Sequence, residues 1–284
     1  MIADVSTEPA DPLLEIVKVP PVISSGPSFR ERARVAELLA AYDGVVLTYG
    51  AARDRHLDVP GEDLVGSIAA TDLVAWYCGH PDADREAIES VLATARSVVV
   101  VGVGNVAVDV TRVLTAPWDR LAATDMPQHV LEALRDSSIN DVHVLGRRGP
   151  AQATWTTKEL KELAELEGVD VTVDDPHDLD LEPISASLVE SDRVVARNVE
   201  VLRSWSEHAL DGSHKHIHLH FHSRPAELRG TDRVETVVVE RTTVDDDGAA
   251  HGTGETYEVG AQLVVRSVGY RGIALPGVPF DARR

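Results

Sequence analysis

The feature that most constrains the fold of this chain is a short strand pattern that runs through a glycine turn into a helix. Ser97–Val101 ends in four consecutive valines, which is typical of a strand buried on both faces of a parallel sheet. Gly102, Gly104 and Ala107 follow in the spacing Gly-x-Gly-x-x-Ala. From Asn105 onward the apolar residues recur at helical spacing. The sequence therefore predicts a strand, a tight turn and a helix in direct succession.

This glycine spacing is typical of a dinucleotide-binding turn. The first glycine permits the tight turn, the second lets a pyrophosphate approach the backbone, and the small third residue lets helix and strand pack closely. The free N–H groups at Asn105 and Val106, together with the helix dipole, would attract the phosphates. The spacing alone is weak evidence, because glycine turns after strands are common. Its position between a strand and a helix favours a nucleotide site.

The segments that follow alternate between strand and helix patterns. Helices are expected over residues 127–135 and 156–166, and strands over 142–145 and Val169–Val173. Such alternation predicts a parallel sheet whose strands are joined by right-handed crossovers.

The chain changes character after about residue 192. Strict alternation over 217–221 and 234–240 is typical of antiparallel strands with one wet face. A turn-rich loop is expected over 245–254, and a last strand over 263–265. The predicted fold class is α/β, a Rossmann-like parallel sheet flanked by helices with an inserted antiparallel β segment.

Two arginines follow the strand after the glycine turn. An NAD site usually has an acidic residue at this place, on the ribose 2′-hydroxyl. Here the sequence reads Gly146-Arg147-Arg148. Two guanidinium groups pair well with a 2′-phosphate, so the pattern favours NADP over NAD. The alternative is a solvated basic turn.

The first hundred residues are less regular. Residues 1–28 are rich in proline and serine and predict an irregular leader. A helix pattern covers 29–41, and an apolar run at 45–47 predicts a buried strand. We therefore expect a leader over 1–28, a connecting region over 29–95 and a nucleotide-binding domain over 96–284.

Composition excludes several classes of function. The chain has 47 acidic and 27 basic residues, a formal net charge of −20, and only 4% aromatic residues. Such a surface repels nucleic acid and anionic lipid. The single cysteine leaves no intrachain disulfide or cysteine-based cluster. No apolar run approaches the roughly 20 residues that span a bilayer. The expectation is a soluble, cytoplasmic protein that binds neither nucleic acid nor membrane.

Longer motifs resemble the adrenodoxin reductase family, which includes the actinobacterial NADPH–ferredoxin reductases. The nucleotide-binding motifs are GVGNVAVDVTRVL and VLGRRGPAQATWTTKEL. The flanking motifs are YDGVVLTYGA, VPGEDLVGSIAATDLVAWY and LVVRSVGYRGIALPGVPFD, so the resemblance runs from about Tyr42 to Asp281. It implies an oxidoreductase that passes hydride from NADPH to FAD and then single electrons to a ferredoxin.

The resemblance also implies roles for individual residues. Val103, Gly104, Asn105 and Val106, with Gly102 in the turn, would meet the pyrophosphate, and Arg147 and Arg148 would hold the 2′-phosphate. Glu159 would contact the ribose on the nicotinamide side, although Thr156 and Glu159 also fit a capping box. Glu162 is a weak catalytic candidate near the reacting rings, and a solvated helix carboxylate is the alternative.

The flavin half of the family pattern is not found in this sequence. The chain is therefore expected to be the NADP-binding portion of an FAD-dependent reductase, with a non-catalytic NADP(H)-binding module or a truncated, inactive fragment as the alternative. Residues 29–95 would then contain a remnant of the FAD-domain helix and strand together with connecting helices. The strand at 45–47 would lack its family neighbours, and an unpaired strand edge invites self-association. Arginines at 147, 148, 193, 197 and 203 are candidates for docking an acidic ferredoxin.

One pattern lies outside the resemblance. Histidines occupy every second position from His214 to His222. On a strand their imidazoles would share one face, with neighbours about 7 Å apart, and adjacent pairs could chelate Zn²⁺, Ni²⁺ or Cu²⁺. Because no carboxylate or cysteine in this stretch of the sequence completes a ligand shell, the expectation is no metal site and an exposed face.

Overall fold

The computed structural model describes residues 35–48, 50–51, 53–207, 212 and 214–281. The chain forms two compact units, one of Ala51–Ile273 and one of Met1–Gly50 with Ala274–Arg284. In the second unit the described helix is α2 (Val35–Ala41), within the predicted 29–41. The leader predicted over 1–28 lies outside the described residues.

The strand predicted at 45–47 is wrong. These residues are irregular, and the Val46 side chain is 87% exposed. A strand exists only through hydrogen bonds to a neighbour, and no described strand pairs with this segment. Apolar composition alone was therefore a poor guide here.

The larger unit is built on a sheet of six parallel strands in the order β2-β10-β3-β4-β6-β5. The predicted parallel sheet is confirmed. Its strands are β2 (Ser67–Ala69), β3 (Ser97–Val101), β4 (Asp141–Leu145), β5 (Val169–Val173), β6 (Lys215–His220) and β10 (Leu263–Arg266).

Helices connect these strands. The α-helices are α3 (Ala70–Tyr77), α4 (Arg85–Leu92), α5 (Asn105–Thr115), α6 (Trp118–Ala122), α7 (Gln128–Arg135), α8 (Thr157–Ala164), α9 (Pro183–Ser191) and α10 (Arg193–Glu207). Two short 3-10 helices are η1 (Pro150–Gln152) and η2 (Pro176–Leu179). No helix in the described ranges is both long and apolar enough to cross a bilayer.

The inserted antiparallel segment is also confirmed. It is a three-stranded sheet of β7 (Ser223–Arg229), β8 (Thr236–Val244) and β9 (Ala250–Gly260). The loop predicted over 245–254 is shorter than expected. A turn is found at Asp245–Ala249, and the residues from Ala250 onward belong to β9. A separate two-stranded ribbon pairs β1 (Arg53–Asp54) with β11 (Tyr270–Arg271).

The prediction that residues 217–221 belong to the antiparallel segment is wrong. Residues 217–220 lie in β6, which runs parallel between β4 and β5 in the main sheet, and residue 221 directly follows it. Ile217 and Leu219 are buried against the helices, whereas the alternate residues are histidines on the opposite face. The alternation arises because one face of this parallel strand packs against the helices and the other carries the histidines. It does not indicate an antiparallel pairing.

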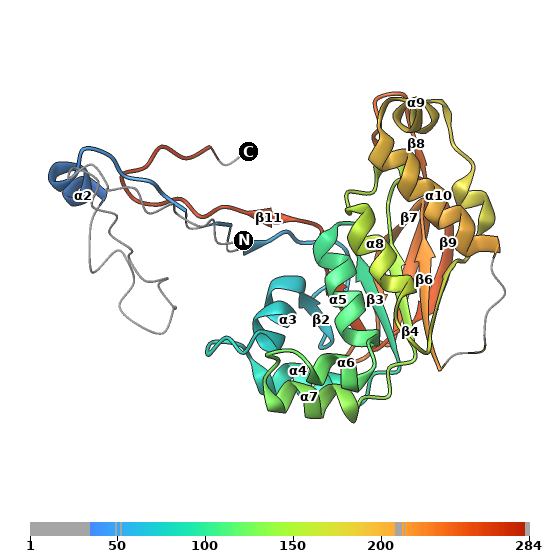
Figure 1. Cartoon of the computed structure of the whole chain (residues 1–284), viewed down its shortest axis with the longest axis horizontal. Coiled ribbons are helices and arrows are strands. Elements are labelled where there is room, and N and C mark those ends of the chain that lie inside the picture. Colours follow the sequence, from blue (N-terminus) through green and yellow to red (C-terminus); the bar gives the residue numbers. More distant parts are fainter. Residues whose placement is uncertain (1–34, 49, 52, 208–211, 213, 282–284) are drawn as a thin grey trace. The chain divides into compact units, whose positions relative to one another are not determined.

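Two apolar cores hold the three layers together. Val98 and Val100 of β3 point into the core shared with α5, α8 and α10. Val99 and Val101 point the other way, into a core completed by Val237 and other residues of the antiparallel sheet. Figure 1 shows the helices on one side of the parallel strands and β7, β8 and β9 on the other. This double covering explains why β3 ends in four consecutive valines, all of them buried.

Candidate functional site

The turn after β3 has the geometry that its glycines predict. Gly102 has φ +129°, and a Cβ there would lie 2.2 Å from the backbone oxygen of Ser267. Its N–H donates to Leu145 O at 2.9 Å. A side chain at Gly104 would meet Thr154 Oγ1 at 3.3 Å. The turn is therefore closed against the loops after β4 and β10, and only glycine fits at its first position.

The helix that follows presents unsatisfied backbone donors. α5 begins at Asn105, and its N-cap, Gly104, offers no side-chain hydrogen bond. The first N–H groups of any helix have no acceptor within the helix. With the positive end of the helix dipole, they form a site for an anionic group such as a pyrophosphate.

Arg147 and Arg148 lie at the same edge of the sheet as this turn. β3 and β4 are parallel neighbours with Val101 opposite Leu145, so both strands end together. The loops also touch, because a Cβ at Gly146 would lie 2.9 Å from Val103 Cγ1. Arg147 is exposed and Arg148 half-buried, and no described carboxylate lies within salt-bridge distance of either guanidinium group.

The antiparallel sheet holds the backbone of the arginine loop. Thr242 Oγ1 donates to Arg147 O at 2.8 Å, and the His222 N–H donates to Arg148 O at 3.1 Å. Ser223 N–H donates to Gly146 O at 2.9 Å. These three hydrogen bonds fix the backbone from which the two arginine side chains extend. No sequence pattern signals this support, because its donors are about 75 to 95 residues away.

The start of α8 is tied to the glycine turn. Asn105 Oδ1 accepts a hydrogen bond from Thr156 N–H at 2.9 Å. Thr156 Oγ1 caps α8 by accepting from Glu159 N–H at 3.3 Å, and it also contacts Glu159 Oε2 at 3.3 Å. Since Asn105 takes the Thr156 N–H, the reciprocal half of the predicted capping box is not formed. Glu159 remains half-buried beside the turn.

Glu162 lies one turn further along α8 and is not a solvated carboxylate. Its side chain is 19% exposed and pairs with Arg112 Nη1 at 2.5 Å. Arg112 also pairs with Asp109, which accepts a hydrogen bond from Tyr77 Oη at 2.5 Å. Burial, and then the hydrogen bond to Asp109, raise the pKa of Tyr77 well above its usual value. This network joins α3, α5 and α8.

Three of the predicted histidines share one face of a strand. His216, His218 and His220 alternate along β6 on the side away from the helices. His214 precedes the strand and is exposed, and His222 follows it with φ +50°. The sequence prediction of a common face thus holds for the middle three only.

The reason for expecting no metal ligand shell there is contradicted. Asp174 follows β5, and its Oδ1 lies 2.9 Å from His218 Nδ1. A further imidazole comes from β4, where His143 Nδ1 lies 3.0 Å from His220 Nε2. These contacts were hidden from the sequence because strand order decides which residues meet. Burial, followed by the charge on His218, lowers the pKa of His143 to about 4.

Comparison with known proteins identifies relatives that match most of this chain. No protein-family model matches the chain. NADPH-ferredoxin reductase FprA of Mycobacterium tuberculosis is 46% identical over 256 residues, which cover 88% of this chain and 55% of the relative. Mitochondrial NADPH:adrenodoxin oxidoreductase of Arabidopsis thaliana is 35% identical over 262 residues, 88% of this chain and 54% of the relative.

A solved structure shares the fold. The structure titled Mycobacterium tuberculosis FprA in complex with NADPH has a TM-score of 0.79 and 44% sequence identity, and the match covers 88% of this chain and 55% of that one. The chain spans about half the length of the relatives it matches. It belongs to the family of the adrenodoxin reductases and NADPH–ferredoxin reductases.

Proposed function

We propose that this chain binds NADP(H) across the ends of β3 and β4, as the nucleotide-binding portion of an FAD-dependent NADPH–ferredoxin oxidoreductase. The observation that carries the proposal is the pair Arg147 and Arg148, beside a tight glycine turn and without a described salt-bridge partner. A relative that was solved with NADPH supports it.

The residues present fit the nucleotide. The N–H groups at the start of α5 would hold the pyrophosphate, since Gly104 leaves the approach open and adds no side-chain cap. Arg147 and Arg148 would hold the 2′-phosphate through charge-assisted hydrogen bonds. Glu159, beside the same turn, is proposed for the ribose on the nicotinamide side. The ion pair of Glu162 with Arg112 supports a structural role for that carboxylate.

The chemistry of the proposed reaction belongs to the flavin. When bound, FAD accepts hydride from NADPH and supplies single electrons to a ferredoxin. Among the described parallel strands, only β3 leads through a Gly-x-Gly turn into a helix. That turn serves the nicotinamide nucleotide, so the FAD is assigned to no residue in the described part of the chain.

Partners and location follow the family. We propose a ferredoxin-like acceptor and a cytoplasmic location. Three of the predicted docking arginines, Arg193, Arg197 and Arg203, are exposed on α10 and support a basic contact surface for an acidic partner. Self-association through residues 45–47 stays a prediction, which sedimentation of the purified chain measures.

The experiment compares NADPH and NADH binding by calorimetry. The wild-type chain is expected to prefer NADPH. Arg147→Gln and Arg148→Gln should each weaken NADPH binding about 10- to 100-fold, the loss of one charge-assisted hydrogen bond, and should leave NADH binding nearly unchanged. Arg135→Gln is the matched control, because Arg135 ends α7 and pairs only with Asp136 among the described residues.

Two outcomes would contradict the proposal. Equal affinity of the wild-type chain for NADH and NADPH would remove the role of the arginines. If Arg147→Gln and Arg148→Gln weakened the binding of NADPH and NADH equally, the arginines would act only through their general charge and not through the 2′-phosphate. The absorption spectrum of the purified protein separates the flavoenzyme from the alternative: a stoichiometric flavin spectrum supports the reductase, and a colourless protein that still binds NADPH supports a non-catalytic nucleotide-binding module.

A further inference from the structure

A cluster of imidazoles and carboxylates lies on the sheet face that the nucleotide does not use. In the parallel register of β4, β6 and β5, His143 is opposite His218, which is opposite Thr172. Register partners project from the same face of a sheet. Asp174 directly follows β5 and joins this row at its end. Three segments that are far apart in the sequence are thereby brought to one place.

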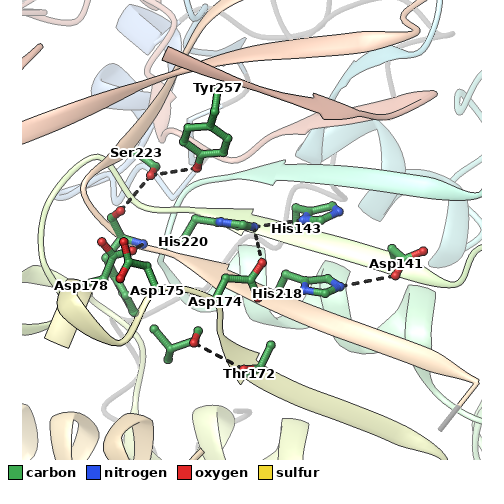
Figure 2. Close-up of polar contacts among 12 residues, drawn as sticks. Asp141, His143, Thr172, Asp174, Asp175, Asp178, His218, His220, Ser223 and Tyr257 are labelled. Carbon is green, nitrogen blue, oxygen red and sulfur yellow. Dashed lines mark hydrogen bonds and ion pairs between the residues drawn. The ribbon is translucent and has the colours of Figure 1, made fainter. Parts of the chain in front are cut away.

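The donor atoms of this cluster converge. One ligand atom each from His143, Asp174 and His218 can be chosen so that all lie within 4.8 Å of one another. His220 Nε2 faces the same space, 3.0 Å from His143 Nδ1 and 3.6 Å from Asp174 Oδ2. Figure 2 shows these side chains drawn together between the strands. A tetrahedral ion with bonds of 2.0–2.1 Å separates its ligand atoms by about 3.3 Å.

We propose that His143, His218 and Asp174 bind one divalent transition-metal ion of the zinc type, with His220 as the fourth ligand. Small rotations of the side chains suffice to bring the observed separations to those of a metal shell. The rings are already aligned, because those of His143 and His218 stack with centroids 4.5 Å apart and planes 15° apart.

The donor set selects the class of ion. Imidazole nitrogens suit Zn²⁺, Ni²⁺, Co²⁺ and Cu²⁺, whereas Mg²⁺ and Ca²⁺ require mostly oxygen ligands. Three imidazoles and one carboxylate therefore exclude the hard cations. The carboxylate partly neutralises the charge of the ion, and because its side chain is only 33% exposed, water screens the contact less than it would at the surface.

An outer partner orients one of the proposed ligands. His218 Nδ1 faces Asp174, and its Nε2 lies 3.4 Å from Asp141 Oδ1. A metal-bound histidine usually donates its other N–H to a carboxylate, which fixes the tautomer and the ring. Asp141 occupies that position before any ion is bound.

The cluster borders a cleft through which an ion can enter. His143, His220 and Asp174 line an open cavity of about 570 Å³, whose other walls include Arg241 and Tyr257. Arg241 is held by Asp175 and Asp178, at 2.9 and 2.8 Å, so its charge is compensated locally. The site is thus reachable from solvent and is not closed by a nearby free cation.

The test is zinc binding by the full-length chain, prepared without a polyhistidine tag and treated with a chelator. Calorimetry with Zn²⁺ is expected to give one site per chain. His218→Ala and Asp174→Asn should each weaken it more than 100-fold, and Asp141→Asn by about 10- to 100-fold. His214→Ala is the matched control, since His214 is exposed and precedes β6. Loading with Co²⁺ should give the visible absorption of a tetrahedral site, which His218→Ala abolishes.

NADPH affinity and the melting temperature of every variant report whether it is folded, and Asp174→Asn preserves shape if the histidine variants are unstable. The proposal is overturned by a flat zinc isotherm, by several weak sites, or by binding that His214→Ala removes and His218→Ala does not. Because the nucleotide assay is separate, a wild-type chain that binds NADPH but not Zn²⁺ would contradict this inference and leave the proposed function standing.

Discussion

Gly102 shows how one residue connects backbone geometry to the nucleotide site. Its φ of +129° is outside the range that a residue with a side chain adopts. The backbone of Ser267, which follows β10 at the end of the neighbouring strand, occupies the place of the missing Cβ. The residue is fixed by a conformational demand and by a contact with a segment about 165 residues away.

Replacing Gly102 with alanine is therefore expected to destabilise the protein by at least ~3 kcal/mol and to weaken NADPH binding, because backbone must move at the turn. Gly168→Ala is the control: it also has positive φ, +71°, but nothing lies within 4 Å of its Cβ position, and its cost should be about 1 kcal/mol. Urea unfolding of the two variants measures the difference. An equal loss of stability in the two variants would mean that the backbone near Ser267 can move to accommodate a Cβ at little cost, and would contradict the prediction.

At the scale of elements, β7 and β8 are linked by a charge pair. Arg224 is opposite Glu240 in the register, and its Nε and Nη2 lie 2.8 and 2.7 Å from Glu240 Oε2. The hydrogen bond from Arg224 holds the pKa of Glu240 below its ordinary value of 4.5. The pair belongs to the sheet that anchors the arginine loop, so its loss reaches the nucleotide site only indirectly.

This shift sets a direction for pH dependence. A carboxyl whose pKa is lowered on folding contributes stability that is complete above its ordinary pKa and is lost as pH falls through the folded-state pKa. Arg224→Gln should lower stability by about 0.5 to 1 kcal/mol at neutral pH, because the pair is partly exposed. The difference should shrink as the pH falls below the ordinary glutamate pKa of 4.5.

Thermal unfolding of the wild type and Arg224→Gln across this pH range measures the effect. In a Glu240→Gln background the same arginine substitution should show no such pH dependence, since the titrating group is gone. A difference that stays constant from acid to neutral pH would rule out Glu240 as its source.

At the scale of the whole molecule, the compact unit Ala51–Ile273 contains the sheet, its helices and the proposed nucleotide site. Residues before β3 are integral to it. β2 pairs with β10, and Leu73 and Trp76 of α3 are almost completely buried in the main core. A nucleotide domain that begins at residue 96 would lack β2 and the buried side chains of Leu73 and Trp76.

A shortened chain of residues 51–273 is expected to unfold in one transition, with a melting temperature within about 4 °C of the full chain, and to bind NADPH equally well. A chain that begins at residue 96 serves as the comparison and should fail to unfold cooperatively, because burying a Leu and a Trp contributes several kcal/mol. Calorimetric melting distinguishes the two. Cooperative unfolding of the shorter chain would place the boundary at 96.

Much of the fold was predictable from local pattern. The valine run, the glycine spacing and the helix after Asn105 act through backbone conformation and burial over a few residues, and the structure reproduces them. The run at 45–47 has similar composition but no neighbouring strand in the described chain. The strand prediction failed there because pairing is not a local property.

The closeness of the two loops that form the proposed nucleotide site was predictable for a related reason. Parallel strands that follow one another in sequence end at one edge, so a turn after β3 and two arginines after β4 were expected to meet. Their supports, Thr242 and the backbone of His222, come from the inserted sheet. No sequence pattern signals a hydrogen bond between such distant segments.

By itself, the sequence determined which residues are strand, turn and helix around the nucleotide site and which charges follow the strands, because these depend on backbone sterics and on the period of apolar residues. Only the tertiary structure decided that β6 lies between β4 and β5. That order is set by how three layers bury their apolar faces together, and it alone places His143, His218 and Asp174 side by side.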